Sequence, residues 1–365
     1  MKAAVCREFG APLEIQELDL RPPGAGEVHV RLDACAICHS DITYMDGGWG
    51  GELPSVYGHE AAGIVQSLGS GVTGLRCDAP VLVTLLRSCG HCYFCKEGQE
   101  SLCETSFPLD EQSPIIDQHG HPIGQGLRTG GFAEEVVVHA SQVVEIPPEI
   151  PMDSASLLSC GVITGFGAVT NVAAVPPGAS VVTIGTGGVG LNCVQGAQIA
   201  NARINVAVDI VAEKLEAARC FGATHVVSPG DEDTEAVIGE LTAGRGADYV
   251  FVAVGSAAAI EQGVRLVRRG GMVVLVGMTT EGVKASFETL HLANDAIHLV
   301  GSKMGASQLK VDVPPLLDHY LAGRLKLREL ISGRYPLDGI NDAIHAVKAG
   351  VALRNVIIFR EQFTR

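Results

Sequence analysis

Residues 181–200 read VVTIGTGGVGLNCVQGAQIA, an apolar stretch followed by a glycine-rich turn and a helix-like segment. Gly185, Gly187 and Gly190 have the spacing G-x-G-x-x-G. In such a context the first glycine permits a tight turn, the second lets a ligand approach the backbone, and the third lets the helix pack closely on the strand. The stretch therefore predicts a strand, a turn and a helix whose N-terminus binds a diphosphate.

A carboxylate follows this turn where a nucleotide ribose would lie. Asp209 closes the next apolar run, INVAVD, nineteen residues after Gly190. There it can accept hydrogen bonds from the ribose hydroxyls of NAD and repel the 2′-phosphate of NADP. FAD uses the same glycine spacing, but commonly at the N-terminus of its chain. NAD is therefore the expected cofactor, bound by Gly185, Gly187, Gly188, Val189, Gly190 and Asp209.

The runs around this motif predict an α/β fold with two domains. SVVTIG, INVAVD, THVVS, DYVFVAVG and GMVVLVG resemble buried parallel strands, and AEKLEAARCFGA between two of them resembles a helix. This predicts a doubly wound parallel sheet over residues 161–300. Residues 1–160 carry alternations such as EVHVRLDA between Gly and Pro turns, which predicts a mostly β domain. Residues 301–365 are expected to pack back on that domain.

Composition narrows the possible partners of the chain. The formal net charge of −15 disfavours nucleic acid and anionic membranes, which attract clustered Lys and Arg. Hydrophobic residues make up 47% of the 365 residues, but every eighteen-residue stretch is interrupted by polar residues or glycine, so no membrane span is predicted. The opening MKAAVCREFG shows no apolar run of a secretory signal. We therefore expect a cytoplasmic protein that acts on a small molecule.

Four of the eleven cysteines lie within fifteen residues and predict a structural zinc site. Their spacing, C-x2-C-x2-C-x7-C, lets a lobe of residues 87–105 wrap four thiolates around one Zn²⁺ with no open position. Free or disulfide-bonded cysteines are one alternative. An iron–sulfur cluster is another, although the ferredoxin run has a different fourth spacing and a following proline. The four residues are Cys89, Cys92, Cys95 and Cys103.

Three distant segments offer ligands for a second, open zinc site. Cys38 in CHSD, His59 in YGHEAAG and Cys160 in LLSCGVITG supply two thiolates and one imidazole. Such a set leaves a tetrahedral zinc one free position, where an alcohol can bind. A simpler alternative for Cys160 is burial in the core. Cys35 with Cys38 also has the spacing of a redox pair.

Three polar residues beside these ligands suggest supporting roles. Ser40 can pass the alcohol proton toward solvent. Asp41 can hold the far nitrogen of His59, and Glu60 adds a further carboxylate beside the metal. Together with the three ligands, these residues form the predicted catalytic site.

The order of these motifs resembles that of zinc-containing medium-chain alcohol dehydrogenases, over nearly the whole chain. The similarity is greatest to the subgroup that holds class III, thiol-adduct formaldehyde and aryl-alcohol dehydrogenases. It implies a GroES-like catalytic domain built from both chain ends around a Rossmann domain, with one catalytic and one structural Zn²⁺. It also implies Cys38, His59, Cys160 and Glu60 at the catalytic zinc, Lys214 at the adenosine ribose, and His39 and Arg354 at the pyrophosphate.

The resemblance implies an activity and also shows two departures. The expected activity is reversible hydride transfer from an aliphatic or aromatic alcohol to NAD, giving an aldehyde or ketone, in a homodimer or alternatively a tetramer. Thr43 stands where many relatives have a histidine that completes the proton relay. Phe107 stands where glutathione-dependent members usually have an arginine, which disfavours the main alternative, a thiol-adduct formaldehyde dehydrogenase. A zinc-free reductase and a non-catalytic zinc-binding protein are further alternatives.

Overall fold

The computed structural model describes residues 1–350 and 352–360 and divides the chain into two compact units. Unit 1 comprises Met1–Cys160, Gln308–Tyr320 and the chain from Leu327 onward, and unit 2 comprises Gly161–Ser307 and Leu321–Lys326. The first is mostly β and the second is α/β, which confirms the predicted fold class.

The boundary near residue 301 differs from the sequence-based expectation, because 301–307 and 321–326 belong to unit 2. Hydrogen bonds explain the difference. The Ser302 amide donates to the Leu275 carbonyl at the end of a strand of unit 2, at 2.9 Å. The Lys326 amide donates to Gln195 Oε1, at 2.7 Å, and Gln195 lies on a helix of the same unit.

Unit 2 contains one six-stranded parallel sheet in the order β14-β13-β12-β15-β16-β17. The chain moves outward from β12 to β14 and then returns to the other side of β12, which creates the switch point where such sheets bind ligands. Five strands lie on the predicted apolar runs, and the short β17 was not predicted. The strands are β12 (Ser180–Ile184), β13 (Ile204–Val208), β14 (His225–Val227), β15 (Ala247–Val252), β16 (Val267–Leu275) and β17 (His298–Gly301).

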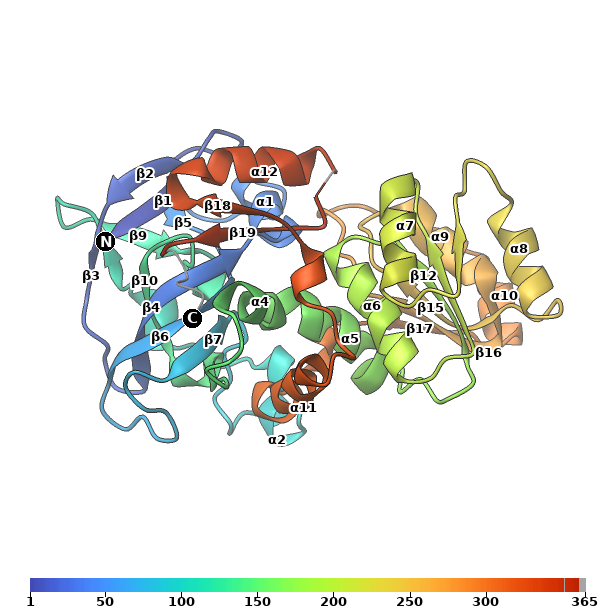
Figure 1. Cartoon of the computed structure of the whole chain (residues 1–365), viewed down its shortest axis with the longest axis horizontal. Helices are drawn as coiled ribbons and strands as arrows, with labels where there is room; N and C mark the ends of the chain where they lie inside the picture. Colours follow the sequence, from blue (N-terminus) through green and yellow to red (C-terminus); the bar gives the residue numbers. More distant parts are fainter. Residues whose placement is uncertain (351, 361–365) are drawn as a thin grey trace. The chain divides into compact units, whose positions relative to one another are not determined.

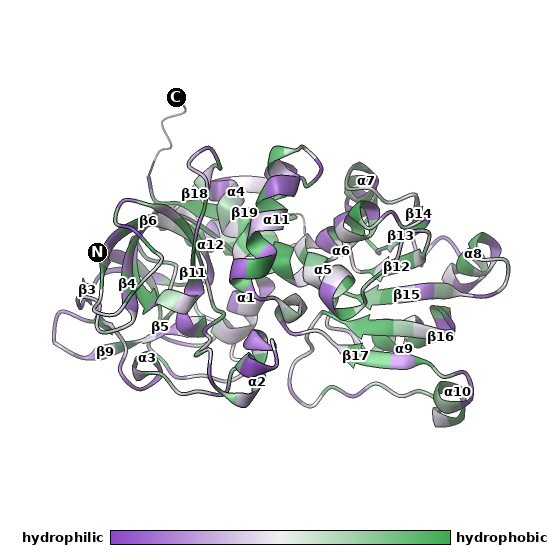
Figure 2. Cartoon of the chain, turned by 90° about the horizontal axis from the view of Figure 1, so that it is seen from below, coloured by the Kyte–Doolittle hydropathy of each residue, from purple (hydrophilic) through white to green (hydrophobic). Residues whose placement is uncertain are grey.

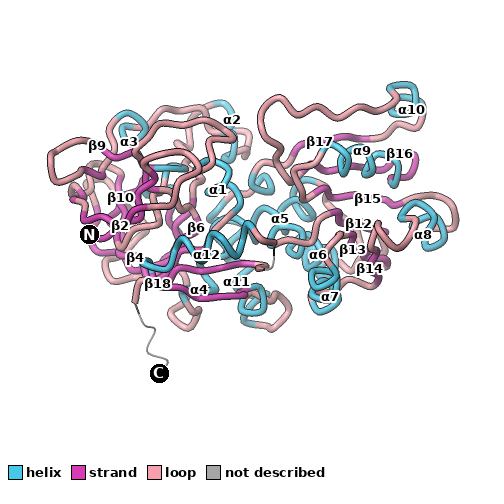
Figure 3. The backbone as a smooth tube through the Cα atoms, turned by 90° about the horizontal axis from the view of Figure 1, so that it is seen from above, coloured by secondary structure: helices cyan, strands magenta, loops and turns pink. Residues whose placement is uncertain are grey.

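Helices cover both faces of this sheet (Figure 1). The strands are mostly hydrophobic (Figure 2), because alternate side chains enter opposite cores. Val182 belongs to one buried cluster with Val264 of α9 (Ala257–Leu266), whereas Val181 belongs to another with Ala197 of α6 (Gly188–Ile199). Between β16 and β17 the chain is mostly loop, with the short α10 (Figure 3). The other helices are α5 (Ile163–Gly167), α7 (Ala212–Cys220), α8 (Thr234–Leu241) and α10 (Thr289–Asn294).

Unit 1 is built on two mostly antiparallel sheets. The larger has the order β11-β7-β6-β4-β19-β18, with β10 also paired to β4. Its strands are β4 (Glu27–Ala36), β6 (Glu60–Leu68), β7 (Pro80–Thr84), β10 (Glu135–His139), β11 (Val143–Glu145), β18 (Ile331–Pro336) and β19 (Arg354–Ile358). The smaller sheet contains β1 (Lys2–Cys6), β2 (Glu14–Glu17), β3 (Asp19–Leu20), β5 (Ser55–Val56), β8 (Ile115–Ile116) and β9 (Pro122–Gln125).

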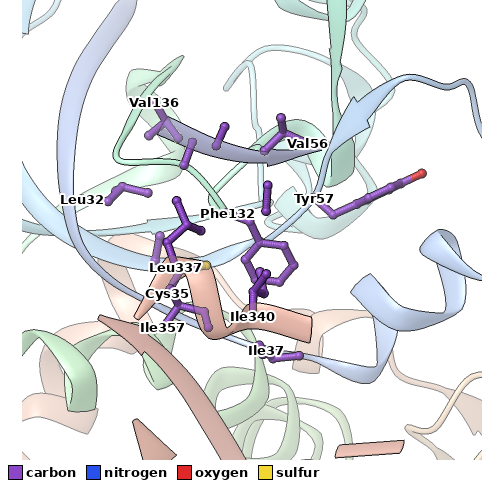
Figure 4. Close-up of a cluster of buried hydrophobic side chains, with 14 of the residues drawn as sticks. Leu32, Cys35, Ile37, Val56, Tyr57, Phe132, Val136, Leu337, Ile340 and Ile357 are labelled. Atoms are coloured by element: carbon purple, nitrogen blue, oxygen red, sulfur yellow. The ribbon is translucent and has the colours of Figure 1, made fainter. Parts of the chain in front are cut away.

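The core of unit 1 joins segments from both ends of the chain. β19 pairs antiparallel with β4 through Val356 and Ala36. Leu32, Phe132, Ile340 and Ile357 belong to one buried cluster (Figure 4). The helices of this unit are α1 (His39–Met45), α2 (Tyr93–Lys96), α3 (Pro108–Glu111), α4 (Met152–Leu157), α11 (Leu309–Leu321) and α12 (Ile340–Lys348).

One continuous helical stretch within the described residues, Met152–Val172, is long and apolar enough to cross a membrane by length and composition. Within it α4 and α5 alternate with two π-helical turns, Leu158–Val162 and Ala168–Val172. Of its most apolar 18-residue window, 78% is buried inside the protein. Core helices of globular proteins have this same composition, so the stretch gives little support for a membrane span.

Candidate active site and metal centres

Unit 1 brings the predicted ligands of the open zinc site together. One donor atom each from Cys38, His59, Glu60 and Cys160 lies within 4.8 Å of all the others. All four side chains are buried. The cluster assembles because three segments meet: Cys38 is the N-cap of α1, His59 lies directly before Glu60 at the start of β6, and Cys160 lies in the first π-helical turn.

Asp41 fixes the orientation of the imidazole. Its Oδ1 lies 2.8 Å from His59 Nδ1 and accepts the Gly58 amide at 2.9 Å. Its Oδ2 accepts the Cys38 amide at 3.1 Å. One carboxylate therefore binds two of the three segments that carry ligands, and it leaves His59 Nε2 as the nitrogen available to a metal.

Arg354 lies beside this cluster in unit 1. Its Nη2 is 2.6 Å from Glu60 Oε2 and 3.2 Å from the Ile37 carbonyl. Burial raises the pKa of Glu60 to about 8, even though the Arg354 charge opposes the rise. Burial would lower the pKa of Arg354, but the negative groups around it, Glu60 first, raise it. The predicted role of Arg354 at a pyrophosphate stays a prediction.

The two thiols of the cluster differ in acidity. A hydrogen bond between them lowers the pKa of Cys38 well below its ordinary value and raises that of Cys160. Burial would lower the pKa of His59, but the charge and hydrogen bond of Asp41 more than offset this effect. The shared hydrogen bond therefore favours a thiolate within the pair, and a thiolate is the form of cysteine that binds metal.

The donor set fits a zinc ion. His59 Nε2 is fully buried, and no hydrogen bond satisfies it within residues 1–350 and 352–360. A buried nitrogen without a partner is destabilising unless something else binds it. Two thiols and one imidazole form a catalytic zinc set that leaves one position open.

The four cysteines of the lobe also converge. Cys89 Sγ lies 4.0 Å from Cys95 Sγ, and Cys92 Sγ lies 3.9 Å from Cys103 Sγ. Tetrahedral zinc with Zn–S bonds of about 2.3 Å requires sulfur separations of about 3.8 Å. Burial raises the pKa of Cys89, but hydrogen bonds from the Thr105 hydroxyl and two backbone amides lower it to about 5. The sulfur separations of the lobe therefore fit a closed zinc site.

The glycine motif of unit 2 has the predicted backbone. Gly185 has a φ of +87°, a conformation that favours glycine. A Cβ on Gly190 would lie 1.8 Å from the Gly185 carbonyl oxygen, so only glycine fits there. Helix α6 begins at Gly188 with Gly187 as its N-cap. Its free amides can bind a diphosphate, as the sequence predicts.

Asp209 lies directly after β13 and binds this turn. Its Oδ2 accepts the Thr186 amide at 2.7 Å and the Thr186 hydroxyl at 3.0 Å. Its Oδ1 accepts the Val211 amide at 3.0 Å. The carboxylate is thus held beside the glycine turn, at the carboxyl end of the sheet. Sequence reasoning missed Thr186, although a hydroxyl residue inside a glycine turn is a visible signal.

The remaining residues predicted from the sequence lie on helices of both units. Ser40 is half-buried in the first turn of α1, directly after the exposed His39. Thr43 donates its hydroxyl to the His39 carbonyl at 2.9 Å, as residues four apart on a helix can. Lys214 is half-buried near the start of α7 in unit 2.

Two segments of the chain match models of known domain families. Residues 24–148 match the model described as alcohol dehydrogenase GroES-like domain, and residues 188–321 match the model described as zinc-binding dehydrogenase. Two such domains in one chain define a zinc-binding dehydrogenase.

Whole-chain comparisons agree. The chain is 34% identical to alcohol dehydrogenase 1 of Pisum sativum, over 99% of this chain and 97% of that protein. An alcohol dehydrogenase zinc-binding domain protein of Burkholderia ambifaria superposes with a TM-score of 0.94 at 33% identity, with 99% of each chain covered. Benzyl alcohol dehydrogenase of Acinetobacter calcoaceticus superposes with a TM-score of 0.92 at 30% identity, covering 98% of this chain and 99% of that one. The chain belongs to the zinc-containing medium-chain alcohol dehydrogenase family.

Proposed function

We propose that this protein is a zinc-dependent alcohol dehydrogenase that transfers a hydride between an alcohol and NAD, giving an aldehyde or ketone. The observation that carries the proposal is the buried set of Cys38, His59 and Cys160, in which His59 Nε2 has no hydrogen-bond partner in the described chain and Asp41 binds the other nitrogen. Zinc held by these three residues would supply a Lewis acid that favours the deprotonated form of an alcohol.

Ser40 is the proposed first acceptor of the alcohol proton. It lies two residues after Cys38, and its partial exposure on α1 allows a proton to pass onward to solvent. The Thr43 hydroxyl donates to a backbone carbonyl. We therefore propose that water, rather than Thr43, receives the proton from Ser40.

The glycine turn and Asp209 are proposed to bind NAD. Bound there, NAD would supply the hydride acceptor. A carboxylate offers about four acceptor positions, and Thr186 and Val211 use three of those on Asp209. The carboxylate can therefore still accept a ribose hydroxyl, and its charge would repel a 2′-phosphate. The likeness to the family further suggests Lys214 at the adenosine ribose and His39 with Arg354 at the pyrophosphate.

An apolar and preferably aromatic alcohol is the proposed substrate. Tyr44 follows Ser40 by four residues on α1, so the two side chains share a face of that helix. Trp49 packs edge-on against Tyr44 with ring centroids 5.2 Å apart. These rings offer a benzylic group an apolar surface. The similarity to a benzyl alcohol dehydrogenase supports the same class of substrate.

Phe107 gives a physical reason to prefer this proposal to a thiol-adduct formaldehyde dehydrogenase. Its side chain is buried, packs against His139 with ring centroids 4.7 Å apart, and lies under the Arg87 guanidinium. It therefore cannot supply the cation that would bind the carboxylate of such a thiol.

We also propose a homodimer. The long segment between Cys103 and Cys160 supports this state by resemblance to the dimeric branch of the family. β17 lies at the edge of the unit 2 sheet, where an unpaired strand edge can pair with a second copy. Light scattering coupled to size exclusion would test it, and a monomer or a tetramer would contradict it.

The activity is tested by NAD reduction with benzyl alcohol and a series of straight-chain alcohols, with and without a low-molecular-weight thiol. We expect thiol-independent activity that is highest with benzyl alcohol and falls in Trp49→Ala. A protein that reduces NAD with none of these alcohols would contradict the proposed function. An absolute requirement for the thiol would instead support the formaldehyde alternative.

A further inference from the structure

Cys160 lies in an unusual helical turn. Residues Leu158–Val162 form a π-helical turn between α4 and α5. Such turns shift the register of the helical hydrogen bonds and occur often at functional sites. The shifted register leaves carbonyls of the turn open to donors from outside the helix.

Two buried hydroxyls supply such bonds. Thr84 Oγ1 donates to the Ser159 carbonyl at 2.6 Å, and Ser159 Oγ donates to the Ala61 carbonyl at 3.1 Å. Both side chains are fully buried. Thr84 lies opposite Glu60 in the pairing of β6 with β7, and Ala61 follows Glu60 directly. The bond to Ala61 therefore joins the turn that carries Cys160 to β6, the strand that follows His59, and the bond from Thr84 joins the same turn to the neighbouring β7.

Thr84 is held in turn by hydrogen bonds that lead to Arg87 at the start of the four-cysteine lobe. Its carbonyl accepts Gln142 Nε2 at 2.8 Å, and Gln142 Oε1 accepts Arg87 Nε at 2.8 Å. Arg87 Nη1 donates to Asp110 Oδ1 at 2.9 Å. Arg87 is 2% exposed and lies two residues before Cys89. A continuous buried network thus runs from the lobe to the π-helical turn.

We infer that Thr84 and Ser159 are positioning residues for Cys160: their two hydrogen bonds hold its thiol against Cys38 and His59 in the geometry that binds the catalytic zinc. This inference rests on the proposed function, and it concerns residues that none of the motifs identifies. A cysteine on a flexible turn would let the metal leave faster, because a ligand must hold its direction as well as its distance.

Thr84→Val is the decisive variant. Valine has nearly the shape of threonine but no hydroxyl, so it leaves the Ser159 carbonyl without this donor. Thr84→Ser restores the donor. The matched control is Thr183→Val in β12 of unit 2, because Thr183 is equally buried and its hydroxyl has no hydrogen-bond partner in the described part of the chain.

The measurements are the zinc content per chain, the rate at which zinc passes to a chromogenic chelator, and the absorption of the Co²⁺-substituted protein. We expect Thr84→Val to release one of its two zinc ions about tenfold faster than wild type and to shift the Co²⁺–thiolate bands. Thr84→Ser and Thr183→Val should behave as wild type. Ser159→Ala, which removes only the bond to Ala61, should show a smaller acceleration and gives a second test if Thr84→Val folds poorly.

Three results would overturn the inference. The first is a Thr84→Val protein with wild-type release and wild-type Co²⁺ bands. The second is equal acceleration in Thr84→Val and Thr183→Val, and the third is equal acceleration in Thr84→Val and Thr84→Ser. A wild-type protein that holds a single zinc would overturn the proposed function as well, so the two failures are distinguishable.

Discussion

The two candidate zinc sites of unit 1 are built in opposite ways. The lobe takes four thiols from fifteen consecutive residues, all of them partly exposed and carried by turns and short helices. The other site takes its ligands from three distant segments, all buried, and adds Asp41, Glu60 and Arg354 around them. The difference shows that one short segment can supply all the ligands of a closed site, whereas an open site requires the whole domain to hold its ligands.

The largest effect should come from the lobe. Cys92→Ser removes one of four thiolates from a segment that has no strand of its own within residues 87–105. We expect the loss of one zinc per chain and a loss of stability on the order of 5 kcal/mol, because structural zinc contributes folding free energy directly. Zinc content and thermal unfolding measure it, with Cys77→Ser, an exposed cysteine outside the lobe, as the control. Full stability without this zinc would contradict a structural role.

Ser40→Ala should affect catalysis alone. Loss of a positioned proton acceptor lowers kcat by roughly 100- to 10,000-fold. Zinc content and melting temperature should match wild type, and Ser40→Thr should retain most activity because it keeps the hydroxyl. Steady-state kinetics with benzyl alcohol and NAD are the measurement. A change in kcat smaller than about threefold would remove Ser40 from the proposed mechanism.

Asp41→Asn should weaken metal binding at the open site and leave the lobe unchanged. The carboxylate bonds to His59 Nδ1 and accepts the amides of Gly58 and Cys38. The amide has one acceptor oxygen, so we expect zinc affinity to fall by about 10- to 100-fold. Competition with a chelator measures it, and Asp46→Asn at the exposed end of α1 is the control. Equal weakening in both variants would argue against a specific role for Asp41.

The smallest effect should be in cofactor choice. Asp209→Asn removes the charge while an oxygen can still accept from Thr186. We expect kcat/KM for NAD to fall about tenfold, because the loss of one charge-assisted hydrogen bond weakens binding by about this factor. The relative use of NADP should rise. Glu213→Gln, an exposed carboxylate on α7, is the control. An unchanged ratio of NAD to NADP activity would show that Asp209 does not select the cofactor.

The contrast between the two sites also separates what sequence could predict from what it could not. The glycine turn and the lobe are local, so spacing alone indicates their conformation. β17 was missed because the four residues of HLVG form no extended apolar run. The pairing of Arg354 with Glu60 and the bond from Thr84 to Ser159 join segments distant in the chain, and no local pattern reports them. Their side-chain chemistry identifies Cys38, His59 and Cys160 as possible zinc ligands, but only the fold shows that they lie together.

The most direct test of this account is the zinc content of Cys38→Ser measured together with its alcohol-dependent reduction of NAD. We expect zinc to fall from two ions per chain to about one, the protein to stay folded because the lobe keeps its metal, and activity to be lost. A variant that keeps two zinc ions, or one that loses zinc and still oxidises alcohols at the wild-type rate, would show that the buried site is not the catalytic centre.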